Sequence, residues 1–585
     1  MNTLIQRFLS VMGVPLLALA INVPVEAIAT PSATSEPLLL AQQSGFEALE
    51  DFDYWVNLCN LMANAENFEE ALKACEQAIV LEPEDSNVWA YRSGVLLKMA
   101  NYPDAIASAD RALTFDPENS LAHTYRCIAF SSLDWNEQAL DACNEALRIN
   151  GNWGNQSPAL AWFHRGLILS QQGQYEQAVI AYDRTLLLEP EDSLTLAYRC
   201  EALTLLGGYE MAIASCQEAL AGNQEWGDQT SALAWSNQGA AYTALGIYDA
   251  AIAAYDQAIS IDPNNAITWG GQGLVLERLR RYEEALNSYT RSAQIKEDYS
   301  LALVGQCAMM NRLRQYEMAF AACEAAIQGD GVWGENGAAQ AWSQRGVALT
   351  GLMQYEDALA SANRAVGIKP DYTEAWNDRA VILWYLEEYE EAIASVERAL
   401  ELNPDYAQAW FNRGTILRTM RRYEDAVEAY NQAIALDPVN ASYQANLSVA
   451  LWYLQQYQEA IAAASQAIAL DPSSQQGWYN LGAAQASLGQ YADAVVAYGR
   501  AVEINPENAD ALTGQGVALA QLGRFEEAIA VLQAALTLNP NQALAYTVLT
   551  AVVNRQQQLL LQEQQERVQQ LLQQPQQPQQ PQPTQ

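Results

Sequence analysis

The 585-residue chain has little of two kinds of side chain on which common protein chemistries depend. Its only histidines, His123 and His164, exclude a histidine triad, an H-E-x-x-H zinc helix and most Cys/His zinc sites. Basic residues are also scarce: the chain has 30 Lys and Arg but 69 Asp and Glu, which gives a formal net charge of −39. A phosphate-binding surface needs clustered bases to displace counterions. We therefore expect no catalytic centre, no metal, no cofactor and no nucleic-acid partner.

The N-terminal apolar run is too short for a typical membrane-spanning helix. It extends from Phe8 to Ile21 and follows a single base, Arg7. A spanning helix needs about 20 apolar residues. Because Ala27-Ile28-Ala29 suits signal peptidase, residues 1–29 are predicted to be a secretory signal, with residue 41 as an alternative end. If this segment is retained, it would instead anchor the protein in a membrane.

The opposite end is also poor in residues that can form a core. Residues 573–585 contain mainly glutamine and proline, which predicts a disordered or polyproline-like tail. Residues 30–51 are expected to be a linker. Between these ends the chain is rich in apolar residues and strongly periodic.

Prolines mark a fixed repeat. They recur every 34 residues at Pro83 and Pro117 and again from Pro370 to Pro540. Between Pro117 and Pro190 the step is 73, the length of one 34-residue and one 39-residue repeat. A fixed period of this length is typical of a solenoid.

Each repeat has two apolar segments at helical spacing, such as 410–420 and 423–436. Small residues, here Gly414 and Ala426, let two helices approach each other, and Pro438 ends the second helix. A helical hairpin of this size cannot bury both apolar faces alone, so neighbouring hairpins must stack.

The order of residues within a repeat resembles the tetratricopeptide repeat. In residues 475–508 the matching residues are Trp478, Leu481, Gly482, Tyr491, Ala494, Tyr498, Ala501 and Pro506. Fourteen such repeats cover residues 52–542, beginning at 52, 86, 120, 159, 193, 232, 266, 300, 339, 373, 407, 441, 475 and 509. Those at 120–158, 193–231 and 300–338 have 39 residues. The resemblance implies an all-α, right-handed α-solenoid, and residues 543–572 are expected to be a capping helix.

All eight cysteines fall at two positions of the repeat. We call a position a slot and count it from the first residue of each repeat; the cysteines occupy slots 8 and 24. In the family, slot 8 faces the second helix near slot 24, which implies one disulfide within each of the four hairpins that carry cysteines; the alternative is that each cysteine is simply a small buried residue. With the predicted signal, this places the protein in an oxidising compartment, periplasmic or extracellular. The predicted pairs are Cys59 with Cys75, Cys127 with Cys143, Cys200 with Cys216, and Cys307 with Cys323.

The three 39-residue repeats share an inserted tryptophan followed by glycine. These tryptophans are Trp153, Trp226 and Trp333. We expect each to cover the open end of its hairpin; the alternative is an exposed binding loop. A shared calcium site is excluded because residues 150–156 contain no carboxylate.

Ligands of this family usually lie along the concave face, which slots 2, 5, 9, 12 and 13 line. The family's best-known clamp uses Lys and Asn, but slot 5 never holds a base here and slot 9 holds Asn only at Asn60. The late repeats hold aromatic side chains and Arg instead, which are typical of binding hot spots. Trp384 and Trp452 could equally pack between repeats. The predicted partner-binding residues are Asn377, Trp384, Tyr385, Phe411, Arg418, Trp452, Tyr453 and Tyr479.

A second series, the arginines at slot 7, is expected to pack its stems between helices rather than to form a ligand-binding ladder. The sequence thus predicts an exported, non-catalytic scaffold that binds extended peptide or protein segments. The alternative is a structural or accessory subunit of an envelope assembly or polysaccharide-export machine.

Overall fold

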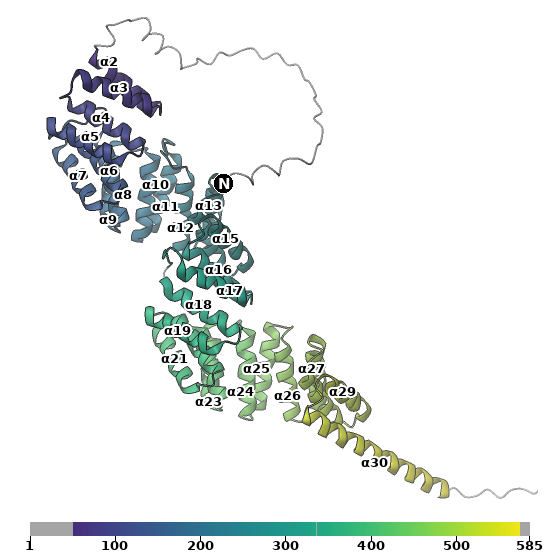
Figure 1. The fold of residues 1–585 in the computed structure, drawn as a ribbon. Helices are drawn as coiled ribbons and strands as arrows, with labels where there is room; N and C mark the ends of the chain where they lie inside the picture. Colours follow the sequence, from purple (N-terminus) through teal and green to yellow (C-terminus); the bar gives the residue numbers. More distant parts are fainter. Residues whose placement is uncertain (1–50, 335, 574–585) are drawn as a thin grey trace, which may run out of the picture. The chain divides into compact units, whose positions relative to one another are not determined.

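The computed structural model describes residues 51–334 and 336–573. These residues form 29 helices and no strand (Figure 1), which confirms the predicted all-helical fold. The predicted signal at 1–29, the linker up to residue 50 and the tail from residue 574 lie outside the described residues.

The chain divides into two compact units, which are described separately. The N-terminal unit ends at Glu191 and contains four helical hairpins. Its helices are α2 (Phe52–Asn64), α3 (Phe68–Leu81), α4 (Ser86–Lys98), α5 (Tyr102–Phe115), α6 (Ser120–Ser132), α7 (Asn136–Ile149), α8 (Pro158–Gln171) and α9 (Tyr175–Leu188).

The C-terminal unit begins at Asp192 and contains ten hairpins and a final long helix. The first helices of its hairpins are α10 (Ser193–Leu206), α12 (Ala232–Ala244), α14 (Ala266–Arg278), α16 (Ser300–Arg312), α18 (Gly337–Gly351), α20 (Thr373–Tyr385), α22 (Ala407–Thr419), α24 (Ala441–Tyr453), α26 (Gln475–Ser487) and α28 (Ala509–Gln521). Their partners are α11 (Tyr209–Ala221), α13 (Tyr248–Ile261), α15 (Tyr282–Ile295), α17 (Tyr316–Gln328), α19 (Tyr355–Ile368), α21 (Tyr389–Leu402), α23 (Tyr423–Leu436), α25 (Tyr457–Leu470), α27 (Tyr491–Ile504) and α29 (Phe525–Leu538). The last helix is α30 (Ala543–Gln573).

The first helix of each hairpin begins at the first residue of its repeat in all but two cases. The exceptions are α8, which begins one residue earlier than predicted, and α18, which begins two residues earlier. Asp and Asn side chains just before several first helices explain the sharp start, because they accept a hydrogen bond from the first turn. Asp85, for example, accepts from the backbone N–H of Val88 at 2.9 Å.

The turn between the two helices of a hairpin has one conformation throughout. Slot 15 has a positive φ in all fourteen hairpins; five of these residues are glycines, such as Gly246, and nine are not, such as Met353. This left-handed conformation ends the first helix and lets the chain reverse. Acidic residues then stand in the first turn of the second helix, as Glu69 and Glu70 do in α3, where the helix dipole favours them.

The two helices of a hairpin approach each other closely because slot 8 is small. In five hairpins a glycine at slot 8 faces a tyrosine ring at slot 24, and an added Cβ would lie only 2.5 to 2.9 Å from that ring. The pairs are Gly166/Tyr182, Gly239/Tyr255, Gly273/Tyr289, Gly414/Tyr430 and Gly482/Tyr498. We call this arrangement the Gly–Tyr latch.

Helix α30 covers the last hairpin with its first half only. Its Ala545 and Val552 are buried, and Val548 and Leu549 pack against Leu532 of α29. Farther along, apolar residues such as Leu561 and Leu572 are exposed.

Candidate interaction surface

The eight cysteines lie in four pairs, each joining slot 8 of a first helix to slot 24 of the second. The sulfurs are at disulfide-bonding distance, and the Cα atoms are 5.1 to 5.4 Å apart, a separation that suits a disulfide. The pairs are those expected from the sequence: Cys59 with Cys75, Cys127 with Cys143, Cys200 with Cys216, and Cys307 with Cys323.

The cysteines belong to the core and not to a surface that a partner could contact. All eight are fully buried, including Cys143, Cys216 and Cys323 on the second helices α7, α11 and α17. They stand at the position where other hairpins carry the Gly–Tyr latch. Their role in the structure is therefore to join the two helices of one hairpin.

The inserted loops are tied to the start of their own hairpin. The serine at slot 1 accepts a hydrogen bond from a loop backbone N–H: Ser120 from Gly151 at 3.1 Å, Ser193 from Gln224 at 3.0 Å and Ser300 from Gly331 at 3.1 Å. All three 39-residue repeats begin with serine, a signal that the sequence interpretation missed.

The inserted tryptophans are half-buried, while the glycines after them are exposed. Trp333 packs against a buried cluster that includes Leu303 and Val304 of α16. This contact favours the covering role over an exposed binding loop.

Asp330 fixes the third of these loops electrostatically. Its carboxylate lies 2.6 Å from the ammonium group of Lys296 and accepts hydrogen bonds from the backbone N–H groups of Ser300 and Val332. Burial by itself would raise the pKa of Asp330, but the Lys296 and backbone hydrogen bonds prevail and lower it to about 2. The loop is thus held by a carboxylate that stays charged in all but strong acid.

Two of the predicted aromatic pairs form the same arrangement, which we call a Trp–Tyr bracket. In the first bracket Tyr385 stacks on Tyr355 of the preceding hairpin, with ring centroids 5.1 Å apart and planes 5° from parallel. Trp384 stands edge-on to Tyr385 at 4.8 Å and donates its indole N–H to Thr419 of the next hairpin at 3.0 Å.

The second bracket repeats the first at residues numbered 68 higher, two repeats along the chain. Tyr453 stacks on Tyr423 at 4.7 Å and 4°, and Trp452 donates to Ser487 at 2.9 Å. Tyr385, Trp452 and Tyr453 remain 46%, 36% and 48% exposed. Each bracket therefore ties successive hairpins together, as one alternative expected, and also presents aromatic surface to solvent.

The slot 5 aromatics are less available than the sequence suggested. Phe411 stacks on Tyr443 at 5.0 Å and contacts Tyr430 of its own hairpin at 5.8 Å, while Tyr479 meets Tyr498 edge-on at 5.7 Å. The sequence analysis placed slot 5 on the concave face, but the rings of Phe411 and Tyr479 also reach the slot 24 tyrosine of their own hairpins. Replacing them would disturb the core as well as the surface.

Asn377 is also removed from the surface. Only 4% of it is exposed, and its side-chain oxygen accepts a hydrogen bond from Asn412 Nδ2 at 2.7 Å. This bond joins α20 to α22, which gives Asn377 a structural role between hairpins.

Arg418 differs from the arginines at slot 7. The slot 7 side chains pair within the solenoid: Arg92 bonds Ser108 and Glu76, and Arg413 lies over the ring of Trp410 and approaches Glu397 at 3.5 Å. These contacts support the expected packing role for the series. Half-buried Arg418, in contrast, forms no ion pair with any described residue, and its Nε is buried without a hydrogen-bond partner there.

Next to Asn377, the carboxyl group of Asp378 lies in an environment that disfavours its charged form. Asp378 on α20 accepts a 2.6 Å hydrogen bond from Ser343 of α18. Burial, reinforced by the nearby charge of Glu374, raises the pKa of Asp378 to about 6, against smaller opposing effects of Ser343, Arg312 and Asn377. This side chain therefore titrates close to physiological pH.

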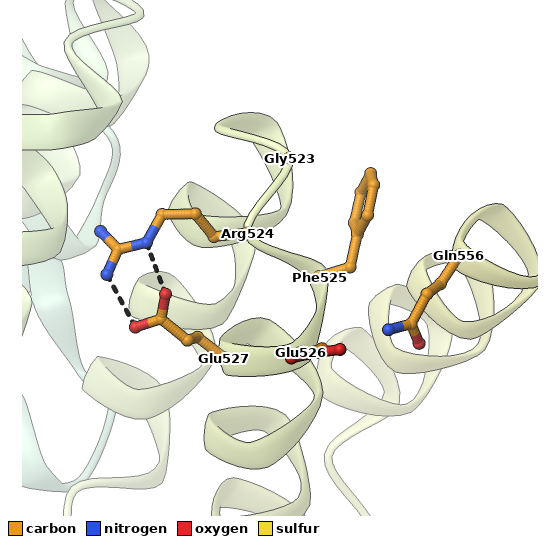
Figure 2. Close-up of a pocket in the computed structure, with 6 residues that line it drawn as sticks. All are labelled: Gly523, Arg524, Phe525, Glu526, Glu527 and Gln556. Atoms are coloured by element: carbon orange, nitrogen blue, oxygen red, sulfur yellow. Dashed lines mark hydrogen bonds and ion pairs between the residues drawn. The ribbon is translucent and has the colours of Figure 1, made fainter. Parts of the chain in front are cut away.

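A cavity of about 290 Å³ lies where α30 passes the start of α29, and Figure 2 shows the side chains of Glu526 and Gln556 pointing toward each other across it. Arg524 and Glu527 in its wall bond each other through two contacts of 2.7 Å. Because these charges satisfy each other, we assign this cavity no ligand.

Within the described ranges, no cluster of three or more His, Cys, Asp or Glu could hold a metal ion. Among the helices that the structure describes, none combines the length and apolar character needed to cross a membrane.

Family models described as "Tetratricopeptide repeat" match several parts of the chain. The matched residues are 61–120, 159–192, 232–265, 377–441, 446–505 and 487–543. No curated protein matches the chain.

Solved structures of similar fold include the APC/C hetero-tetramer Cut9-Hcn1. The likeness has 16% identity and a TM-score of 0.44, and it covers 86% of this chain and 96% of that one. YrrB, described as a TPR protein with an unusual peptide-binding site, is 24% identical with a TM-score of 0.28 over 32% of this chain and 96% of its own. MamA is 24% identical with a TM-score of 0.27 over 29% of this chain and 93% of its own.

Proposed function

Because this chain is a tetratricopeptide repeat protein, we propose that it is a non-catalytic scaffold that binds an extended peptide or protein segment along the first helices α20, α22, α24 and α26. Repeats of this family are typical of protein–protein interaction and generally non-catalytic. The observation that carries the proposal is the pair of exposed Trp–Tyr brackets.

The brackets have the properties of binding hot spots. Aromatic rings supply a large contact area, and here they are held rigidly: Tyr385 and Tyr453 by stacking, Trp384 and Trp452 by an indole hydrogen bond to the next hairpin. A rigid ring loses little conformational entropy when a partner covers it. Tyr385, Trp384, Trp452 and Tyr453 with Arg418 form the proposed surface; Phe411 and Tyr479 support it from the core side.

The proposed compartment is oxidising and outside the cytoplasm, periplasmic or extracellular. Disulfides persist in such compartments and are rare in the cytosol. The support is the placement of all eight cysteines in four pairs at bonding distance.

The proposal is tested by exchanging the exposed rings of both brackets. The variant Tyr385→Ala/Tyr453→Ala removes the two rings, and Tyr546→Ala in α30, 66% exposed, is the matched control. Proteins bound to each immobilised variant are quantified, and the affinity of any partner lost from the double variant is then measured with purified components. A hot-spot ring is worth about 2 kcal/mol, roughly a thirtyfold change in Kd.

We expect the double variant to lose the partner while the control and the folded helix content are unchanged. Partner binding that survives the double change would contradict the proposal. It would favour instead the alternative of a structural or accessory subunit in an envelope assembly or polysaccharide-export machine, which would use other faces.

A further inference from the structure

Three residues of one row of the proposed surface come from three successive hairpins. Trp384 on α20, Arg418 on α22 and Trp452 on α24 all occupy slot 12. Helix α22 contacts both α20 and α24, so the arginine lies between the two tryptophans along the row. The sequence order of the row is therefore aromatic, cationic, aromatic.

The cation of this row is not used by the solenoid. Arg418 has no ion pair within the described part of the chain, and its Nε is buried there without a partner. Leaving such a donor unsatisfied costs free energy, which a ligand acceptor would recover. Arg421, the exposed slot 15 residue in the turn after α22, likewise forms no ion pair with a described residue, whereas Arg422 donates to Asp425 at 2.6 Å. Two of the three arginines at this end of the hairpin are therefore without an ion pair among the described residues.

The polar groups around the tryptophans are, in contrast, already satisfied. The indole N–H of Trp384 bonds Thr419, and that of Trp452 bonds Ser487. The hydroxyls of Thr419 and Ser487 also donate to backbone oxygens of their own helices, at 3.0 Å and 2.9 Å. The brackets therefore offer apolar ring surface and little hydrogen bonding. A polysaccharide, whose hydroxyls need partners, is matched less well than a peptide with apolar side chains.

From this arrangement we infer that the slot 12 row recognises an extended peptide segment in which one acidic side chain is flanked by two aromatic or large aliphatic side chains. The inference rests on the proposed function and names the class of ligand. Arg418 binds the carboxylate, and the brackets at Trp384 and Trp452 bind the two flanking side chains.

The repeat geometry sets the spacing of that segment. Axes of packed helices lie about 10 Å apart, and a chain in the polyproline II conformation advances about 3.1 Å per residue, with every third side chain on the same side. One hairpin therefore corresponds to about three ligand residues. The expected pattern is an apolar residue, two spacers, Asp or Glu, two spacers and a second apolar residue.

The probe is a fluorescein-labelled peptide with Phe-Gly-Ser-Glu-Gly-Ser-Phe at its centre, and its binding to the full chain is followed by fluorescence anisotropy. A matched peptide has Gln in place of Glu. The protein variants are Arg418→Gln and, as control, Arg413→Gln. Both remove one charge from α22, but Arg413 is held over Trp410.

We expect Arg418→Gln to weaken the Glu peptide about tenfold, the effect of losing one charge-assisted contact of about 1.4 kcal/mol, and to leave the Gln peptide unchanged. Arg413→Gln should bind both peptides as the unmodified chain does. The reversed pair, Arg418→Glu with a central Lys in the peptide, should bind more tightly than Arg418→Glu with the Glu peptide. Circular dichroism checks that each variant is folded.

The assignment of Arg418 would be overturned if the Arg418→Gln variant preferred the Glu peptide over the Gln peptide by the same ratio of Kd values as the unmodified chain does. An equal loss in Arg413→Gln would also overturn it. Binding of both peptides that depends on Tyr385 and Tyr453 but not on Arg418 would leave the proposed scaffold function intact and reject only acid recognition. Absence of peptide binding at about 1 mM, with Arg418-dependent binding of an anionic polysaccharide such as alginate, would reject the peptide in favour of a polysaccharide ligand.

Discussion

Two classes of hairpin solve the same packing problem in different ways. In the hairpins beginning at α2, α6, α10 and α16, slots 8 and 24 are joined by cysteine sulfurs. In those beginning at α8, α12, α14, α22 and α26, a glycine at slot 8 leaves room for the tyrosine ring at slot 24. In both classes the residue at slot 8 contacts the residue at slot 24 directly, so a change at one slot affects the other.

The two classes also differ in how they contribute to stability. A disulfide stabilises the protein mainly by restricting the unfolded chain. A buried tyrosine stabilises it through contacts in the folded state. The disulfide needs an oxidising compartment, and the Gly–Tyr latch does not. The predictions below separate these contributions.

The largest expected effect concerns the covalent class. Replacing both Cys127 and Cys143 with Ala should destabilise the hairpin of α6 and α7 by about 3 kcal/mol, the cost of freeing a loop of about 15 residues. Hydrogen exchange of the amides in these two helices measures the local free energy of opening. The unmodified protein treated with reductant should show a similar loss in this hairpin, while the hairpin of α8 and α9, which has a Gly–Tyr latch, should respond much less to reductant.

The Gly–Tyr latch should be sensitive to a single methyl group. Gly414→Ala places a Cβ 2.7 Å from the ring of Tyr430, which should cost about 1–3 kcal/mol as overpacking. Gly367→Ala in α19 is the control, because nothing lies within 4 Å of the added Cβ and alanine is the better helix former. Denaturant unfolding should therefore change in opposite directions for the two variants; equal effects would argue that slot 8 has no special role.

Asp378 makes a pH-dependent contribution that opposes folding. Its pKa is about 6 in the folded protein, against about 3.9 in an unfolded chain. Below pH 4 both states hold the proton and the group contributes nothing. Between pH 4 and pH 6 the unfolded chain loses the proton first, so stability falls as the pH rises. Asp378→Asn should raise the Tm by about 2 °C or more at pH 7, with a difference that vanishes near pH 4; a difference independent of pH would contradict this account.

The smallest effect is expected at the slot 15 turn, which both classes share with the remaining hairpins. Met353 at slot 15 has a φ of 61° and is 76% exposed, so Met353→Gly removes backbone strain without loss of packing. We expect a gain of about 0.5–1 kcal/mol in the free energy of unfolding. Gly246→Ala, at the same slot with a φ of 74°, should lose about 1 kcal/mol. Thermal unfolding of the two variants should move in opposite directions.

Periodicity predicted the fold because it fixes which residues face the helix pair. The repeat starts that follow from the proline spacing lie within two residues of the starts of the first helices. Because Cys59 and Cys75 occur together in one repeat, the sequence indicated that they lie close to each other. The same reasoning paired Cys200 with Cys216 and Cys307 with Cys323. The left-handed slot 15 was missed because nine non-glycine residues occupy it, and these carry no local signal for that conformation.

The candidate surface was predicted less completely for a different reason. A slot number gives the face of a helix but not the rotamer of a side chain or its partner in the next hairpin. Asn377 was expected on the surface, yet it turns toward Asn412 between helices. The stacking of Tyr385 on Tyr355 did leave a signal in the sequence, because the residues of the first bracket recur two repeats later. Tyr423, Trp452 and Tyr453 repeat Tyr355, Trp384 and Tyr385, and Ser487 replaces Thr419.

The central claim is that slots 8 and 24 are connected by a disulfide in one class of hairpin and by glycine–tyrosine packing in the other. Counting free thiols tests it most directly. The protein is isolated from the compartment where it is made, without reductant and with thiols blocked during lysis, then denatured and titrated with a thiol reagent. The account predicts no free thiol among the eight cysteines, and eight after reduction. Eight reactive thiols before reduction would contradict both the covalent class of hairpin and the proposed oxidising compartment.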